Sequence, residues 1–478
     1  MGISSHLFIK TTIIRETEMI LYNECILGID VGTTNISVVI INVKENKVIE
    51  SRTITNDSKL LTDIDFNECD VNRIMDKSRQ IINHFMEHCP NIKSIGITGQ
   101  MHGVVYVDEN GQAVSPLYTW QDNRGNRLFA QNKTYCEEIY ARTGHTVFPG
   151  YAFSTLFYNQ VNSLEPRGAK TFCTIMDYIA MNLTGNITPL IHPTNAASFG
   201  LYNLQKNCFE SRAIEQLELS HLTLPRIAKE GEIVGFYHNI PVGVAIGDNQ
   251  SSFYGSVKDE KTSALVNFGT GSQISVVLDS VKEVDEDLEI RPYLFGKYLL
   301  CGSALCGGKA YAVLEKFFFK YAEMIMENPK SQYEYMNELA LKHYCNEQTL
   351  KVSTQFSGTR KDPALRGKIT QIDYANFTPE NLILGTLQGM VEELKKYFDC
   401  MKLNHITGLI ASGNAVQRNR VLRMLLADRF HLDVDLTSNN EEAAIGAALY
   451  ASVSNNIIEA VQAKKLITYR EDHKNELE

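Results

Sequence analysis

The sequence predicts an α/β protein made of two similar lobes with a ligand cleft between them. Its 478 residues are too many for one ordinary hydrophobic core and enough for two. An apolar run that enters a Gly-Thr turn and leaves it as a second apolar run occurs twice, around residues 32–34 and around residues 269–272. Such a repeat predicts an internal duplication, and the cleft between duplicated lobes is a usual place for a ligand.

The first half of the chain predicts several strands, one long helix and a set of insertions. Apolar residues recur at helical spacing over residues 71–86. The region from about 116 to 235 is expected to consist of insertions on the first lobe, with helices of its own. The apolar runs that predict strands are residues 26–31, 36–41, 48–54 and 92–98, of which the first two form a hairpin around the Gly-Thr turn.

The second half predicts the same theme again. Residues 264–268, 273–278 and 406–411 predict strands, residues 381–398 a helix, residues 412–414 a turn into a helix near Val416, and residues 441–448 a close-packed helix of small residues. We therefore expect an extension at residues 1–22, a first lobe at 23–255, a second lobe at 256–455 and a C-terminal helix or tail at 456–478.

Composition excludes several classes of protein. A hydrophobic share of 44% with 21% charged residues is typical of a globular protein, and no apolar run approaches the roughly 20 residues that span a bilayer. The formal net charge of -10 argues against a broad nucleic-acid-binding surface. The ten cysteines form no CxxC pair, which favours reduced thiols in a cytoplasmic protein. We expect neither a nucleic acid nor a membrane as partner.

The first Gly-Thr turn carries groups that suit a metal and a phosphate chain. Asp30 lies at the end of a buried strand, where a carboxylate is costly unless a partner such as a divalent cation satisfies it. The residues that follow expose backbone N–H and hydroxyl donors for phosphate: Gly32, Thr33, Thr34 and Asn35. The alternative is an ordinary hairpin turn capped by Asp30.

The second turn is the same device without the acid. A single glycine-rich turn is a weak signal, because such turns are common. Two of them, one in each half and each between apolar strands, favour a phosphate site that uses both lobes. The residues expected to contact phosphate here are Gly269, Thr270 and Gly271.

Asp248 is the candidate catalytic acid-base residue. It follows the apolar residues 242–246 and precedes a predicted helix, so it is expected at the C-terminal edge of a sheet, where ligand sites gather. A carboxylate in this place can accept the proton of a hydroxyl that attacks a γ-phosphate. The alternative is a helix N-cap, a position that suits aspartate well.

Two loops rich in hydrogen-bonding groups are candidates for binding a sugar. The candidate residues are Gln100, Met101, His102, Trp120 and Asp122, together with Asn249 next to Asp248. Each loop has a structural alternative. His102 and Trp120 could be core residues, and Asp122 could form a local ion pair with Arg124.

The segment from Ser412 to Asn419 is a candidate for binding a purine. Gly413 would let a flat ring approach the backbone, and Asn414 and Gln417 could hydrogen-bond its edge. The alternative is a tight turn into a helix. The helix at residues 441–448 is expected to be structural.

Together these motifs resemble the FGGY family of carbohydrate kinases, in order from Leu27 to Ser452. The resemblance implies a duplicated actin-like, ribonuclease H-like fold with ATP and a sugar between the lobes. It implies that Asp30 binds Mg²⁺, that Asp248 is the catalytic base, and that both turns hold phosphates. It also implies an adenosine site at Gly307 and Gly308 with Gly413 and Asn414, and a sugar pocket at Met101-His102 and residues 120–122.

Within the family, the finer likeness favours sedoheptulose as the sugar, phosphorylated on its terminal hydroxyl. The segments at residues 119–122, 195–200 and 242–248 resemble sedoheptulose kinases, whereas Gly99 to Gly103 is shared with xylulose kinases. Xylulose or another pentulose is the alternative. Met101-His102 replaces an Arg-Glu pair of glycerol-phosphorylating relatives, and Ser37 replaces an arginine, which disfavours glycerol. An actin-like ATPase and a non-catalytic sugar sensor are the other classes.

Overall fold

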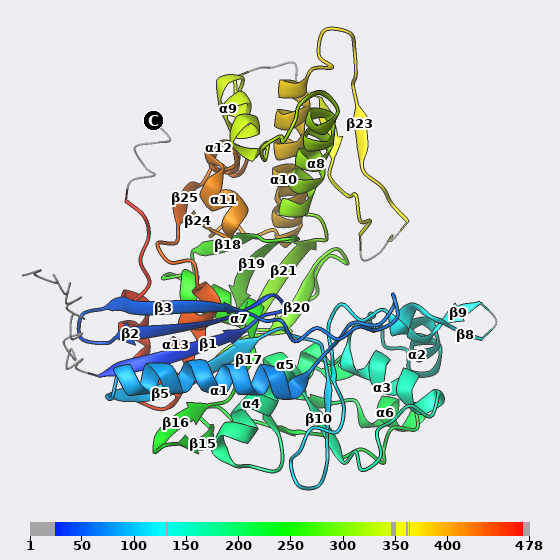
Figure 1. Ribbon diagram of the computed structural model, residues 1–478, viewed down its shortest axis with the longest axis vertical. Helices are drawn as coiled ribbons and strands as arrows, with labels where there is room; N and C mark the ends of the chain where they lie inside the picture. Colours follow the sequence, from blue (N-terminus) through cyan, green and yellow to red (C-terminus); the bar gives the residue numbers. More distant parts are fainter. Residues whose placement is uncertain (1–23, 131, 346–349, 360–361, 363, 472–478) are drawn as a thin grey trace, which may run out of the picture.

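The computed structural model describes residues 24–130, 132–345, 350–359, 362 and 364–471. The expected extension at residues 1–22 lies outside the described residues. The chain forms two lobes, one above the other along the longest axis of the molecule, and each contains a central sheet (Figure 1). No helix in the described part of the chain is both long and apolar enough to cross a membrane.

The first sheet has the strand order β15-β16-β5-β1-β2-β3, with β17 also paired to β5. The central strand β1 pairs antiparallel with β2 and parallel with β5. The strands of this sheet are β1 (Cys25–Val31), β2 (Asn35–Asn42), β3 (Lys47–Thr55), β5 (Ile92–Gly99), β15 (Ile233–Tyr237), β16 (Ile240–Gly243) and β17 (Ile246–Gly247).

The second sheet repeats this pairing pattern. Its central strand β18 pairs antiparallel with β19 and parallel with β24, and its order is β20-β21-β19-β18-β24-β25. The strands are β18 (Ser263–Phe268), β19 (Ser272–Leu278), β20 (Glu289–Pro292), β21 (Tyr298–Ala304), β24 (Gly408–Ser412) and β25 (Asp433–Leu436). The duplication that the sequence predicts is therefore confirmed in the order and direction of the strands.

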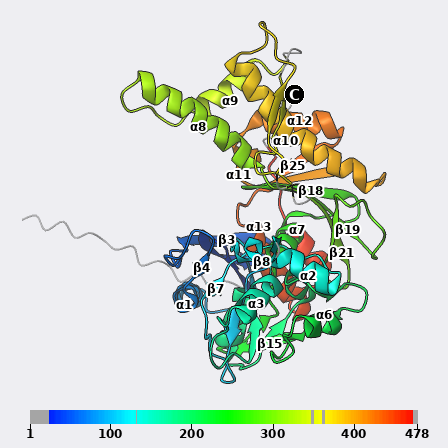
Figure 2. The same ribbon diagram turned by 90° about the vertical axis from the view of Figure 1, so that its right-hand side faces the viewer.

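Helices α1 and α10 lie where hydrophobic periodicity predicts them, whereas the long helix α8 was not predicted. Helix α1 ends two residues later than predicted, and α10 begins two residues earlier and ends three later. The helix predicted near Val416 is two helices, α11 and α12, because the Asn419 side chain accepts a hydrogen bond from the Leu422 N–H and starts a new helix. These helices are α1 (Val71–His88), α10 (Pro379–Met401), α11 (Asn414–Arg418) and α12 (Arg420–Phe430). Figure 2 shows α8 (Gly308–Ile325) extending from the second lobe away from both sheets.

The predicted insertions are present in the first lobe as short elements. Their helices are α2 (Tyr135–Thr143), α3 (Ala152–Val161), α4 (Ile175–Thr184), α5 (Pro193–Ser198) and α6 (Ser211–Gln216). Their strands are β7 (Leu117–Tyr118), β8 (Leu128–Ala130), β9 (Lys133–Thr134), β10 (Thr171–Cys173), β11 (Leu190–Ile191), β12 (Tyr202–Asn203), β13 (Cys208–Phe209) and β14 (Arg226–Ile227). The remaining elements are β4 (Glu68–Cys69), β6 (Val105–Val107), α9 (Tyr333–Lys342), β22 (Lys351–Ser353), β23 (Lys368–Thr370) and α14 (Ala460–Lys465).

Two helices hold the lobes together where they meet (Figures 1 and 2). Helix α7 (Asp248–Ser256) follows the first sheet, and α13 (Glu442–Ser454) follows the second sheet but packs on β1 and β5 of the first. Glycines at matching positions of neighbouring strands allow this approach, because a Cβ at Gly28 or Gly96 would overlap a backbone carbonyl of α13. The Ser251 hydroxyl of α7 donates to the Ala443 carbonyl at 2.6 Å.

The hydrophobic core joins the lobes as well as filling them. Each lobe has its own cluster of buried side chains. A third cluster includes Ile26 and Ile246 from the first sheet, Leu265 and Ile410 from the second, and Leu449 from α13. All ten cysteines lie in the described part of the chain, and none of them forms a disulfide there. The site between the lobes is therefore built on a shared, packed base.

Candidate active site

A small cavity of about 240 Å³ lies between the two lobes. It is bounded on one side by the end of β1 and the start of α7, and on the other by β18 and β19. Its lining residues are Asp30, Asp248, Asn249, Ser252, Leu265, Asn267, Gln273, Ser275 and Ala443. The two acids that the sequence singles out thus meet in one partly open cavity.

Asp30 is a partly buried acid whose Oδ1 atom lacks a partner. Its Oδ1 atom is buried and accepts no hydrogen bond from any residue that the structure describes. Burial raises the pKa of this carboxyl to about 7, and the negative charges of Asp248 and Glu441 add to the rise. An acid in this state gains most from a bound cation, because the cation would replace the lost hydration.

Asp248 is the first residue of α7 and faces the same cavity. It is not the N-cap, which is Gly247, so the alternative of a capping aspartate does not apply. Its Oδ1 atom accepts a hydrogen bond from the Asn249 N–H at 2.7 Å. Burial raises the pKa of Asp248 to about 6, while that hydrogen bond and the charge of Arg291 oppose the rise. A carboxyl with a pKa near neutrality suits general-base chemistry.

The two acids fit a hydrated Mg²⁺ ion better than a metal held by protein side chains alone. Among the described residues, no group of three or more His, Cys, Asp or Glu side chains could hold a metal ion. Mg²⁺ commonly takes only one or two carboxylates and completes its shell with water and substrate phosphate oxygens. The orphaned Asp30 carboxyl, with Asp248 beside it, supplies a donor set of that kind.

The first Gly-Thr turn is braced from two sides. The Asn56 amide donates to the Gly32 carbonyl at 2.8 Å, and the Trp120 indole N–H donates to the Thr33 hydroxyl at 2.9 Å. Thr34 and Asn35 are exposed at the tip of the turn. The turn is therefore held in shape while its tip stays open to a ligand.

The second turn is braced by backbone instead. The Gly307 N–H donates to the Thr270 carbonyl at 3.0 Å, and the Gly308 N–H donates to the Gly269 carbonyl at 2.9 Å. A Cβ at Gly307 would overlap the backbone of Gly271, so this contact requires a glycine. The predicted adenosine residues Gly307 and Gly308 thus lie directly on the second phosphate turn, at the start of α8.

The other predicted nucleotide residues come to the same place. Gly413 has a φ of 95°, and a Cβ there would overlap the Phe268 backbone, just before the second turn. Asn414 is exposed at the start of α11. The Gln417 Oε1 atom accepts a hydrogen bond from Arg470 at 3.2 Å, so its side chain is anchored to the C-terminal segment.

A second, larger cavity of about 900 Å³ lies beside the sugar loops. Met101 and His102 line it from the first lobe, and Gln250, Arg291 and Ser303 are among the residues that line it from α7 and the second lobe. Asn249 joins the two cavities, because its amide contacts the Met101 sulfur at 3.8 Å. Met101 and Asn249 therefore stand between the two cavities, and Asp248 itself lines the small one.

His102 is held rigidly in the wall of this cavity. Its backbone has a φ of 72°, and its ring stacks on Tyr151 with 4.3 Å between ring centres. The Nδ1 atom lies 2.8 Å from the Ser198 carbonyl. Because a carbonyl only accepts, the proton of the neutral ring is on Nδ1. His102 is a cavity-lining residue and not a buried core histidine.

Three predicted sugar residues occupy other positions. Trp120 is 44% exposed, so it is not a core residue, and it binds the phosphate turn through Thr33. Asp122 forms the local ion pair with Arg124 at 2.7 Å and is 1% exposed. Gln100 is 3% exposed, and its amide atoms are buried with no hydrogen-bond partner in the described chain. The residues named as lining the two cavities include neither Asp122 nor Gln100.

Several residues of the site were not predicted. Gln273 directly follows the second turn, so its place in the lining of the small cavity could have been found by analogy with the first turn. Arg291 lies on an edge strand far along the chain, in a segment with no distinctive motif. Glu441 lies near enough to Asp30 to raise its pKa, and it accepts a hydrogen bond from Thr53 of the first lobe at 3.0 Å.

Comparison with known proteins agrees with this geometry. The mouse (Mus musculus) sedoheptulokinase is 27% identical over 423 residues, which cover 80% of this chain and 86% of the relative. A glycerol kinase of Streptococcus gordonii is 26% identical over 458 residues, with 90% and 89% of the two chains covered. Their identities to this chain are nearly equal, so these relatives alone do not select a substrate.

Solved structures show the same fold. A ligand-bound xylulose kinase from Lactobacillus acidophilus superposes with a TM-score of 0.80 at 19% identity, covering 95% of this chain and 96% of the other. The Plasmodium falciparum glycerol kinase, solved with ADP, superposes with a TM-score of 0.77 at 20% identity, with 95% and 96% covered. The duplicated actin-like fold is thereby confirmed.

Family models match nearly the whole described chain. The model of the N-terminal domain of the FGGY family of carbohydrate kinases matches residues 25–265, and that of the C-terminal domain matches residues 264–455. The two matches meet where the first lobe gives way to the strand β18 of the second. The chain belongs to the FGGY family of carbohydrate kinases, phosphotransferases that use an alcohol group as acceptor.

Proposed function

We propose that this protein transfers the γ-phosphate of ATP to the terminal hydroxyl of a ketose, with sedoheptulose as the substrate. The observation that carries the proposal is the pairing of Asp30 and Asp248 in one cavity, flanked by a Gly-Thr turn of each lobe. The lobe of residues 23–255 would hold the sugar, and the lobe of residues 256–455 would hold the nucleotide.

The residues divide the chemistry between them. Asp248 orients the terminal hydroxyl and accepts its proton as the hydroxyl attacks the phosphorus in line. The N–H and hydroxyl groups of the two turns hold the phosphate chain, and Gly307, Gly308, Gly413 and Asn414 border the purine. Asp30 would hold Mg²⁺, which when bound neutralises charge on the phosphates. Catalysis is then mainly a matter of position and charge.

The substrate rests on weaker support than the reaction. Met101 and His102 border the larger cavity, whose volume exceeds that of a small polyol such as glycerol, and Asn249 contacts Met101 from the small cavity. Sedoheptulose is favoured by the motif likeness and by the mouse relative, and xylulose by the structural neighbour. A pentulose is therefore the alternative substrate.

The test is sugar-dependent release of ADP by the purified protein with Mg-ATP. Sedoheptulose, xylulose, ribulose, ribose and glycerol are compared in parallel at equal concentrations. The highest kcat/KM is expected for sedoheptulose. A clear preference for xylulose would keep the reaction and replace the substrate. ATP use that no sugar stimulates would favour an actin-like ATPase, and sugar binding without turnover would favour a sensor.

A further inference from the structure

Arg291 is a buried cation in the wall of the larger cavity, and the sugar motifs do not include it. It lies on β20, the edge strand of the second sheet, and is 6% exposed. Its Nη2 atom donates to the Glu289 carboxylate at 2.6 Å. Its Nε atom is buried and has no hydrogen-bond partner in the part of the chain that the structure describes.

This arrangement is costly for a residue with a purely structural role. A guanidinium removed from water needs hydrogen-bond acceptors for most of its five N–H donors, and one ion pair leaves some of these donors without an acceptor. Glu289 and Arg291 are two residues apart on one strand, so both side chains project from the same face. Together they present N–H donors and carboxylate acceptors side by side along the cavity wall.

The position of Arg291 connects it to the reacting end of the site. The Gln250 amide donates to the Pro292 carbonyl at 3.0 Å, which ties β20 to the helix that begins at Asp248. Met101 and His102 line the same cavity from the first lobe. A ligand in this cavity would therefore be contacted by both lobes at once.

The charges around the cavity decide which kind of ligand fits. Its lining includes four acidic side chains, Glu286, Asp287, Glu289 and Asp362, and two that are always cationic, Arg291 and Lys396. Lys396 is paired with Asp287 at 3.1 Å, and Arg291 with Glu289. Acidic side chains outnumber cationic ones in this lining, so the cavity disfavours an anionic ligand, whereas a neutral polyol can bond to donors and acceptors alike.

We propose that the Arg291–Glu289 pair is the second lobe's recognition element for the sugar, and that it selects a neutral polyhydroxy sugar over an acid sugar. Arg291 donates to one or two sugar oxygens, and Glu289 both orients Arg291 and accepts from a neighbouring hydroxyl. This inference rests on the proposed function, because it names the class of acceptor that the same site takes.

Binding is measured by isothermal titration calorimetry, with sedoheptulose and xylulose as neutral probes and gluconate as the acid probe. In Arg291→Gln the Kd for the neutral sugar should rise about 10-fold or more, because a charge-assisted hydrogen bond is lost. The Kd for ATP should change less than about twofold. Arg226→Gln is the matched control, because Arg226 forms an exposed ion pair with Glu232 and lines neither cavity.

Glu289→Gln gives a result that a structural role would not produce. The variant leaves Arg291 without its counter-charge, so gluconate should gain affinity relative to the neutral sugar by about fivefold or more. Arg291→Lys keeps the charge and loses the planar fork, and it should bind the neutral sugar more weakly than wild type. This variant tests the proposal even if Arg291→Gln does not fold.

Three results would overturn the proposal. These are a folded Arg291→Gln that binds the neutral sugar like wild type, an Arg291→Lys that does so, and a wild type that binds gluconate as tightly as the neutral sugar. ADP release separates the two levels of the argument. If sugar stimulates turnover but its binding does not depend on Arg291, only this inference is rejected. If sugar binding depends on Arg291 but no turnover occurs, only the proposed kinase reaction is rejected.

Discussion

The two Gly-Thr turns have the same scaffold and differ by one functional group. Asp30 in β1 and Asn267 in β18 each stand one residue before the last residue of the strand, and both line the small cavity. The Asn267 amide is satisfied, because it donates to the Ser412 hydroxyl at 3.0 Å. The Asp30 Oδ1 atom has no hydrogen-bond partner among the described residues. Duplication thus supplied two Gly-Thr turns of the same scaffold, and only the first carries a carboxylate that could hold a cation.

The turns also differ in what holds them. The first is braced by the side chains of Asn56 and Trp120 in addition to one backbone hydrogen bond, from the Asn56 N–H to the Thr34 carbonyl at 2.7 Å, whereas the second is braced by the backbone of Gly307 and Gly308. A backbone brace depends on the fold alone. A side-chain brace can be changed by one substitution, so the first turn is the easier one to perturb without disturbing the sheet.

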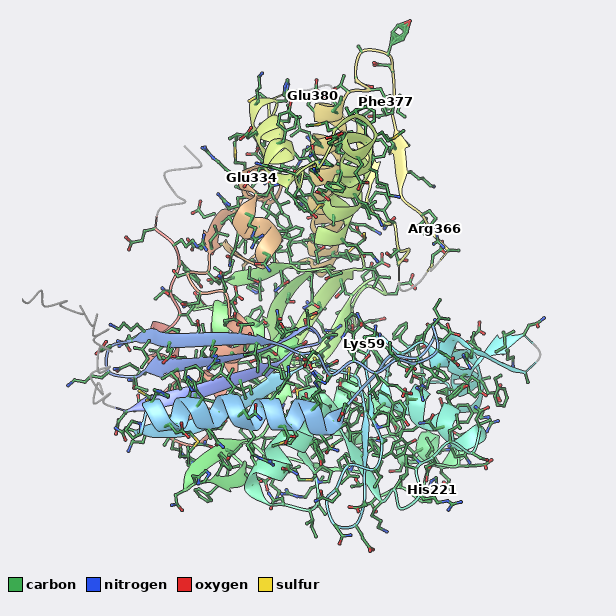
Figure 3. The ribbon with its side chains drawn as sticks, in the orientation of Figure 1. Lys59, His221, Glu334, Arg366, Phe377 and Glu380 are labelled. Atoms are coloured by element: carbon green, nitrogen blue, oxygen red, sulfur yellow. The ribbon has the colours of Figure 1, made fainter. Side chains whose placement is uncertain are left out.

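The largest effect is expected for Asp248, which has no acidic counterpart on β18 or β19 in the lining of the small cavity. Asp248→Asn should lower kcat about 100-fold or more, because the proton acceptor is lost, while the Kd for ATP stays close to wild type. Steady-state kinetics and calorimetry measure the two quantities. Glu380→Gln is the control, because Glu380 lies at the far end of the second lobe (Figure 3). Near-normal turnover in Asp248→Asn would exclude Asp248 as the base.

Asp30→Asn makes the first turn resemble the second. We expect the Mg²⁺ concentration for half-maximal activity to rise about 10-fold or more, because a carboxylate that would hold the ion is removed. The stability of the ligand-free variant should also depend less on pH than that of the wild type. The raised pKa of Asp30, about 7 against an ordinary value of 3.8, means that folding loses stability as pH rises from about 4 to about 7.

Thermal unfolding in the absence of metal at pH 5 and pH 8 measures this second effect. The wild type should lose more of its melting temperature than Asp30→Asn over that interval. The pKa of Asp248 is also raised, so Asp248 lowers stability in the same direction as pH rises. The Asp30→Asn variant should therefore keep part of the pH dependence of the wild type. An identical pH dependence of stability in both proteins would contradict the description of Asp30 as an acid whose pKa is raised in the folded state.

Asn267→Asp tests the comparison from the other side. The substitution replaces a satisfied amide with a carboxylate near Asp30 and Asp248, so it should lower the free energy of unfolding by about 1–3 kcal/mol at pH 8. Mg²⁺ should restore part of this loss, because the added charge favours a cation. Urea unfolding with and without Mg²⁺ measures both. Unchanged stability in the absence of metal would show that position 267 is better hydrated than its place in the cavity implies.

Sequence patterns predicted the parts of this molecule that depend on local chain geometry. The two hairpins, α1 and α10 follow from hydrophobic periodicity and glycine placement, which act over neighbouring residues. Asp30 and Asp248 could be singled out because an acid at the end of an apolar strand is unusual in itself. Their proximity required only that the two strands share one sheet edge.

What the sequence could not predict depends on tertiary contacts. Asp122 was expected to contact the sugar, yet Arg124 and the Asn67 N–H bond both of its carboxylate oxygens, and the buried pair satisfies itself. Arg291 could not be found, because its place in the cavity wall depends on β20 lying opposite the loop of Met101 and His102. The packing of α13 on the first sheet was also not predictable from the sequence of the helix, because its small residues allow close packing against any neighbouring helix or sheet.

The smallest effect is expected at the brace of the first turn. Trp120→Phe keeps the aromatic ring and removes the indole N–H that donates to Thr33, a bond worth about 0.5–1.5 kcal/mol. The Kd for ATP should rise about two- to tenfold, while sugar binding and the melting temperature change little, because the side chain is partly exposed. Trp120 is the only tryptophan, so its fluorescence in the wild type should change when ATP binds at the turn. The fluorescence should not change when sugar is added without nucleotide.

Thr33→Val removes the acceptor of the Trp120 hydrogen bond and should weaken ATP binding at least as much as Trp120→Phe, since Thr33 is also a proposed phosphate contact. If Trp120→Phe binds ATP like wild type while Thr33→Val does not, the hydroxyl acts on the phosphate directly, and the first turn needs no side-chain brace beyond Asn56.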